Sequence, residues 1–118
     1  MLSKNQAVFA KNIAKLILKI EEDGNHCTFG EALRTPEQAA LYEKEGKGIK
    51  NSLHCQRLAC DLNLFTPVYE YQVNKSFYEP YGVFWESLHT ANKWGGNFVH
   101  KDGTAFSDSN HFQMSAVD

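Results

Sequence analysis

The chain has 118 residues and a mass of 13.4 kDa, the size of one domain, and its 42% apolar and 13% aromatic residues exclude a disordered chain. A net charge of −2 and a pI near 6.2 argue against a nucleic-acid partner. No apolar run reaches the roughly 20 residues of a membrane span, and lysines interrupt the runs near the start, so we expect neither stable membrane insertion nor a signal peptide. We therefore expect a single domain over residues 1–118. The cysteines, three in number and without a CxxC pair, are expected to pack as small apolar groups.

The first part of the chain predicts two helices separated by a strand. Apolar residues on one helical face predict a helix from about Lys4 to Glu22. Alternation from Cys27 to Leu33 predicts a short strand. Thr35 as a cap and Pro36 at the first helical position predict a second helix, which two glycines at positions 46 and 48 should end.

The second part of the chain predicts a buried strand, a long loop, a helix and two more strands. The apolar run Leu58–Phe65 is typical of a central strand. The polar, tyrosine-rich segment Thr66–Pro80 is expected to be a loop, and its length makes it a candidate for function. A helix is expected over Tyr81–Lys93, and two strands, linked through an Asp-Gly turn, over Trp94–Phe98 and His111–Met114. The predicted fold class is α+β, with helices packed on a small, mostly antiparallel sheet.

Four polar residues stand out as candidates for metal chemistry: His54, Asp61, Asp108 and His111. Imidazole and carboxylate groups suit Zn²⁺, and three protein ligands leave a fourth position open. On one helix, His54 and Asp61 would lie about 10 Å apart, so a loop followed by a strand would bring them together better. Each residue also has an ordinary interpretation, as a hydrogen-bonded packing histidine, a strand-end carboxylate or a turn aspartate. The remaining histidines are expected to have no role in such a site: His26, His89 and His100.

The segments SLHCQRLACD (residues 52–61) and DSNH (residues 108–111) carry spaced histidines and aspartates. They resemble two signatures of the zinc D-alanyl-D-alanine carboxypeptidase family, which also contains vancomycin-resistance dipeptidases and bacteriophage L-alanyl-D-glutamate endopeptidases. Residues 52–61, SLHCQRLACD, are similar to the signature S-x-H-x-x-G-x-A-x-D, and residues 108–111, DSNH, are similar to D/E-x-x-H. Phe29–Gln38 and Trp94–Phe98 add further similarity, so the resemblance runs from about Phe29 to Met114. Arg57 departs from the pattern because it stands where the signature has glycine. The departure implies either an altered turn between His54 and the strand or an arginine that points away from the metal.

The resemblance implies a zinc site in a cleft of the fold. His54, Asp61 and His111 would hold Zn²⁺, with the fourth position open to water. Asp108 would act as the general base and return the proton to the leaving amine. A protein that only binds its partner, without hydrolysis, would have no need of a base at Asp108.

The resemblance also implies residues that contact the substrate. Arg34 would stabilise an oxyanion or bind a substrate carboxylate, although it could instead form a surface pair with Glu31 or Glu37. Ser52 would donate a hydrogen bond to the peptide, unless it serves only in a turn. Trp94 is expected in the core, with a wall of the cleft as the alternative.

The implied substrate and partner is the stem peptide of peptidoglycan. A short chain without a signal peptide resembles a phage endolysin, which is made in the host cytoplasm and acts on the wall, in the periplasm, as a monomer. We expect cleavage between L-alanine and D-glutamate, with removal of a terminal D-alanine as the enzymatic alternative. A third hypothesis is a wall-binding module without turnover, since the hedgehog signalling domain resembles this fold and keeps zinc while serving as a binding module.

Overall fold

A computed structural model describes residues 2–33, 35–45, 53–100, 102–105 and 107–115. Two of the predicted substrate-contacting residues, Arg34 and Ser52, lie outside the described residues. The two glycines expected to end the second helix also lie outside them.

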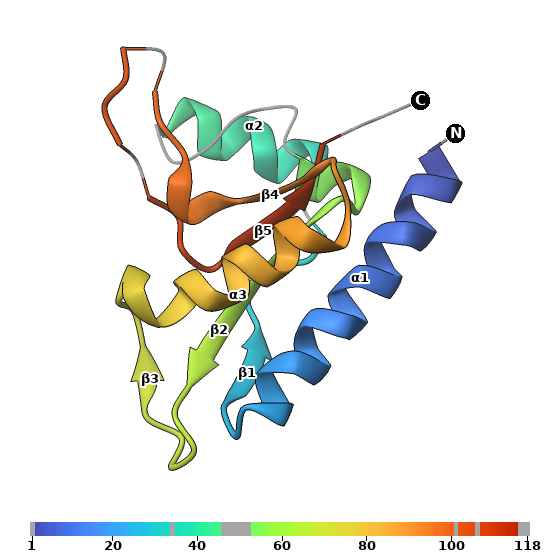
Figure 1. Cartoon of the computed structure of the whole chain (residues 1–118). Helices are drawn as coiled ribbons and strands as arrows, with labels where there is room; N and C mark the ends of the chain where they lie inside the picture. The colour runs from blue at the N-terminus through green and yellow to red at the C-terminus, as the bar shows by residue number, and fades with distance from the viewer. Residues whose placement is uncertain (1, 34, 46–52, 101, 106, 116–118) are drawn as a thin grey trace.

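The described residues form three α-helices, two 3-10 helices (η) and five strands (Figure 1). In chain order they are α1 (Leu2–Glu22), β1 (His26–Phe29), α2 (Pro36–Lys44), η1 (Leu53–Gln56), β2 (Ala59–Phe65), β3 (Tyr71–Gln72), α3 (Lys75–Leu88), β4 (Asn92–Trp94), η2 (Gly95–Asn97) and β5 (His111–Met114).

The strands form one antiparallel sheet in the order β1-β2-β5-β4, and β3 also pairs with β2. The first half of β2 pairs with β5, with Asp61 opposite His111, whereas its end pairs with β3, with Leu64 opposite Gln72. This α+β architecture, with an antiparallel sheet and helices against it, confirms the predicted fold class.

The two faces of the sheet differ in chemistry. Along β2, buried Cys60, Leu62 and Leu64 alternate with the less buried Asp61 and Asn63. Because successive side chains of a strand point to opposite faces, the apolar set faces the core and the polar set faces away from it. The core is completed by apolar side chains of α1 and α3, which pack against each other and lie on the same side of the sheet in Figure 1. The polar face is therefore left for a site.

The predicted loop Thr66–Pro80 is wrong, because this segment contains β3 and the first turns of α3. Pro80 lies inside α3, where a proline costs about 3 kcal/mol. Burial of Tyr78, Tyr81 and Trp85 on one side of the helix outweighs that cost, since each large side chain contributes roughly 1.5–3 kcal/mol. The helix therefore begins six residues before the predicted start at Tyr81.

The Tyr78 hydroxyl group explains why this segment folds against the sheet. It accepts a hydrogen bond from the Leu64 backbone N–H at 3.1 Å and donates one to the Gln72 carbonyl oxygen at 2.8 Å. A side chain of α3 thus bonds to the backbones of both β2 and β3. The polar residues of this segment, taken by themselves, do not indicate this contact.

Several other elements agree with their predictions apart from their ends. The helix expected from Lys4 is α1, and Thr35 caps α2 by accepting a hydrogen bond from the Gln38 backbone N–H. The strand expected over Cys27–Leu33 ends at Phe29. The strand expected over Trp94–Phe98 is wrong except at Trp94, because β4 spans Asn92–Trp94 and Gly95–Asn97 forms η2. The helix expected to reach Lys93 ends at Leu88, which leaves room for β4.

Candidate metal site

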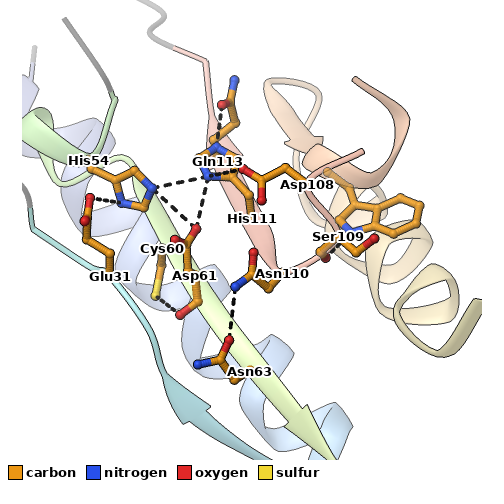
Figure 2. Close-up of polar contacts among 11 residues, drawn as sticks. Glu31, His54, Cys60, Asp61, Asn63, Asp108, Ser109, Asn110, His111 and Gln113 are labelled. Atoms are coloured by element: carbon orange, nitrogen blue, oxygen red, sulfur yellow. Dashed lines mark hydrogen bonds and ion pairs between the residues drawn. The ribbon is translucent and has the colours of Figure 1, made fainter. Parts of the chain in front are cut away.

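The polar face of the sheet brings three of the predicted residues together. Asp61 of β2 and His111 of β5 are directly opposite in the antiparallel register, so their side chains lie on the same face. His54 comes from η1, the short helix immediately before β2. Figure 2 shows the His54 ring turned toward both Asp61 and His111.

The backbone between His54 and β2 turns in a left-handed conformation at Arg57, with φ of +56°. The Arg57 N–H donates to the His54 carbonyl oxygen and the Leu58 N–H to the Leu53 carbonyl oxygen, a helix-ending turn in which glycine is usual. The departure from the signature at Arg57 therefore leaves a turn of the kind that glycine favours. It carries the modest strain of a side chain at positive φ.

The three ligand atoms lie at nearly equal distances from one another. His54 Nε2 is 3.2 Å from His111 Nδ1 and 3.4 Å from Asp61 Oδ1, and His111 Nδ1 is 3.2 Å from Asp61 Oδ1. A tetrahedral zinc ion with ligand bonds of about 2.0–2.1 Å separates its ligand atoms by about 3.3–3.4 Å. The group therefore has the spacing and the donor atoms of three vertices of a zinc tetrahedron, and it could hold a metal ion.

Gln113 orients the His111 ring so that its Nδ1 atom faces the other two ligand atoms. His111 Nε2–H donates to Gln113 Oε1 at 2.8 Å, which leaves Nδ1 of the neutral ring without a proton and facing Asp61 and His54. Gln113 lies two residues along β5 and thus on the same face as His111. Its backbone oxygen is held by the Trp85 indole N–H at 2.9 Å, so the strand that carries both residues is anchored in the core.

Glu31 lies on the other side of the site, behind His54 (Figure 2). Its Oε1 is 3.9 Å from His54 Nδ1, so a proton on Nδ1 would face a carboxylate and Nε2 would be left for a metal. The Glu31 backbone oxygen accepts from the Asp61 N–H at 2.7 Å, which ties the segment after β1 to the ligand strand. Neither Glu31 nor Gln113 was predicted to orient a ligand. The only signal in the sequence was the i+2 spacing of Gln113 from His111.

Asp108 lies next to the three ligands but outside their triangle. Its Oδ2 is 4.0 Å from His111 Nδ1, and its side chain is 54% exposed. Its backbone N–H donates to the Gly95 carbonyl oxygen, and a Cβ atom at Gly95 would come within 2.4 Å of the Asp108 backbone oxygen. Gly95 therefore permits the close approach that sets Asp108 beside the site.

Hydrogen bonds and charge within the cluster shift the pKa values of Asp61 and His111 toward their ionised forms. Burial disfavours the ionised form of Asp61, but hydrogen bonds and positive charge from His111 and His54 outweigh it and lower the pKa of Asp61 to about 2. Burial also disfavours the charged form of His111, yet its hydrogen bonds to Asp61 and Gln113 raise its pKa above the usual 6.5. Asp61 is thus an ionised ligand at neutral pH, and protons compete with a metal at His111.

Stabilisation by zinc is expected to increase between pH 6 and pH 8. Without metal, protonated His111 beside ionised Asp61 stabilises the fold below about pH 6.5, and this contribution is lost as the pH rises through the raised pKa of His111. Metal binding has the opposite dependence, because His111 must be neutral to bind. Thermal unfolding with and without zinc at several pH values measures the difference. A difference that shrinks as the pH rises would contradict this assignment.

Gln113→Leu is expected to weaken zinc binding by about tenfold or more, because the His111 ring loses the acceptor that sets its tautomer. Zinc competition against a chelating dye measures the change. Gln72→Leu is the matched control, since Gln72 is a half-buried strand glutamine whose side chain donates to the Glu70 carbonyl oxygen. Equal affinity of the two variants would remove Gln113 from the site.

Two of the histidines that were expected to have no role in the site do lie elsewhere. His26 pairs with Glu21 and stacks on Tyr69, and His89 Nδ1 accepts from the Ala91 N–H.

Burial and the Asp61 charge raise the pKa of the Cys60 thiol to about 12, so Cys60 acts as a packing group, as expected. In the part of the chain that the structure describes, no helix is long and apolar enough to cross a membrane.

A comparison with solved structures finds the same fold in a peptidase. The chain is similar to the L-Ala D-Glu endopeptidase ChiX of Serratia marcescens, with a TM-score of 0.62 and 19% identity over 76% of this chain and 67% of that one. No family model matches the chain, and no curated protein does. At this identity the likeness shows the fold, an α+β fold shared with an endopeptidase.

Proposed function

We propose that this chain is a zinc peptidase that hydrolyses the stem peptide of peptidoglycan between L-alanine and D-glutamate. The observation that carries the proposal is the convergence of His54, Asp61 and His111 within 3.4 Å of one another, with the Asp108 carboxylate 4.0 Å from His111. The likeness in fold to an L-Ala D-Glu endopeptidase supports it.

The donor set favours zinc over other common ions. Two imidazole nitrogens and one carboxylate oxygen suit Zn²⁺, whereas magnesium and calcium prefer oxygen ligands alone. Three protein ligands leave an open fourth position, which is typical of catalytic sites. A bound zinc ion supplies Lewis acidity, since it lowers the pKa of water toward about 7 and polarises a carbonyl group.

The residues of the chain supply the proton transfers. Asp108 is close to the ligands yet exposed, so its carboxylate is available to accept a proton from the attacking water. The water oxygen forms a bond to the peptide carbonyl carbon, and the carbon–nitrogen bond then breaks. Asp108 passes the proton to the leaving nitrogen, which departs as an amine. Asp61 stays ionised throughout because its pKa lies near 2.

The choice of substrate rests on the resemblance of residues 52–61 and 108–111 to the two family signatures. The bond is chosen because the neighbour in fold is named for it. The stem peptide has alternating L and D centres, so a site shaped for it differs from that of an ordinary protease.

Digestion of purified peptidoglycan tests the proposal. The zinc-loaded protein should expose new amino groups at D-glutamate and release no free D-alanine, as read by mass spectrometry, and chelator-treated protein should release neither product. Release of D-alanine alone would replace the endopeptidase by a carboxypeptidase. A protein that holds zinc and binds the wall without cutting it would be a binding module.

A further inference from the structure

Trp94 is fully buried in the core, as expected, but its indole N–H is bonded to the segment that carries Asp108. The N–H donates to the Ser109 carbonyl oxygen at 2.7 Å. Ser109 directly follows Asp108, and His111 comes two residues later. A core side chain therefore bonds to the backbone between the proposed base and a proposed metal ligand.

Residues 108–111 form a β-turn. The His111 N–H donates to the Asp108 carbonyl oxygen at 3.0 Å, so these two residues are the first and last of the turn. The structure gives neither Ser109 nor Asn110 a positive φ, as in a type I turn. Rotation of the central peptide would give a type II turn with a positive φ at Asn110, a residue type that tolerates this conformation. The indole bond opposes this rotation, because it fixes the direction of the central carbonyl group.

Two glycines and a carboxylate hold Trp94 in place. Gly82 of α3 and Gly96 of η2 lie against different parts of the indole ring, and a Cβ atom at either position would overlap with the ring. The Trp94 backbone N–H donates to the Glu86 carboxylate of α3 at 3.0 Å. The packing of α3 and η2 therefore sets the direction of the indole N–H.

We propose, on the basis of the proposed function, that Trp94 is a positioning residue: it holds the turn that carries Asp108 and thereby sets this carboxylate for proton transfer. The Asp108 side chain is 54% exposed, so its place beside the ligands follows from its backbone. Proton transfer requires hydrogen-bond distance, and a misplacement of about 1 Å can lower a rate by about 10²-fold. His111 is held separately, by the pairing of β5 with β2 and by Gln113. The effect should therefore fall on the rate and leave zinc affinity unchanged.

Trp94→Phe should lower kcat by about tenfold, while KM and zinc affinity change less than about twofold. Replacement of Trp94 by benzothienylalanine keeps the shape of the ring and removes the N–H, so it should give the same loss of kcat without the void that phenylalanine leaves. Tyr81→Phe is the matched control. Tyr81 is a buried aromatic residue of α3 whose hydroxyl group bonds to Asp23 and Asn25, away from the turn. This control should lower the Tm and leave kcat unchanged.

A double variant tests whether Trp94 acts through Asp108. In the Asp108→Ala background, Trp94→Phe should lower the remaining rate by less than about twofold, since the group that it positions is gone. A full tenfold loss in that background would overturn the proposal. An equal loss of kcat in Tyr81→Phe, or a normal kcat with benzothienylalanine, would also overturn it.

Amide hydrogen exchange tests the turn without turnover. The His111 N–H closes the turn, whereas the Met114 N–H of the same strand donates to the Leu58 carbonyl oxygen. Benzothienylalanine at position 94 should raise the exchange rate of the His111 N–H about tenfold relative to that of Met114. This result in a protein that hydrolyses no stem peptide would reject the peptidase and keep the role of Trp94 in the turn. Hydrolysis with unchanged exchange and unchanged kcat in the variant would do the reverse.

Discussion

Asp108→Ala is expected to keep its zinc and its fold and to lose about 10²–10⁴-fold in the rate of hydrolysis. The Asp108 carboxylate lies 4.0 Å from His111 Nδ1 and is half exposed, so its removal leaves the three ligand atoms and the buried core in place. Bound zinc, thermal unfolding and cleavage of the stem peptide should be measured on the same preparation.

Two further variants make this result specific to the carboxylate. Asp108→Asn keeps the size of the side chain and should lose nearly as much activity, because an amide cannot accept the proton. Glu79→Ala removes an exposed carboxylate of α3 and should behave as the unmodified protein. A near-normal rate in Asp108→Ala would reject the assigned base and leave the metal site intact.

His111→Ala is expected to lose both zinc binding and activity. It removes a ligand atom that lies 3.2 Å from both of the others. A metal that binds only the folded state stabilises it by about 2.7 kcal/mol at a free concentration of 100 times its Kd. For a domain of this size that corresponds to a rise in Tm on the order of 10 °C.

The measured quantity for His111→Ala is the rise in Tm on adding zinc, because the variant also loses its hydrogen bonds to Asp61 and Gln113 in the metal-free state. This rise should disappear in His111→Ala. It should persist in His26→Ala, the matched control, since His26 pairs with Glu21 away from the site. Stoichiometric zinc in the His111→Ala protein would refute the ligand assignment.

Much of the fold could be predicted where the information is local. The apolar periodicity that places Phe9, Ile13 and Leu16 on one face predicts α1, and these residues are buried. Thr35 and Pro36 predict the start of α2, because a helix cap depends on residues within one turn of it. The tyrosine-rich segment could not be predicted in this way, because the Tyr78 hydroxyl group accepts a hydrogen bond from Leu64 of β2, 14 residues earlier, beyond the range of a local pattern.

The candidate site was predicted in its residue types but not in its geometry. His54, Asp61 and His111 could be selected as a donor set suited to zinc and by resemblance to the two signatures. Their distances depend on the register that sets Asp61 opposite His111, residues that are 50 positions apart. Gln113 and Glu31 carry no signature of their own, and only their places next to His111 and His54 show what they do.

The sequence by itself determined the first two helices, the central strand and the types of ligand, because each depends on residues adjacent along the chain. The tertiary structure decided the orientation of the two histidine rings, the position of Asp108 beside the ligands, and the bond from the Trp94 indole to the turn that carries Asp108. These features arise from hydrogen bonds and side-chain packing between distant segments. No local pattern specifies them, since the same residues in a different strand register would face opposite sides of the sheet.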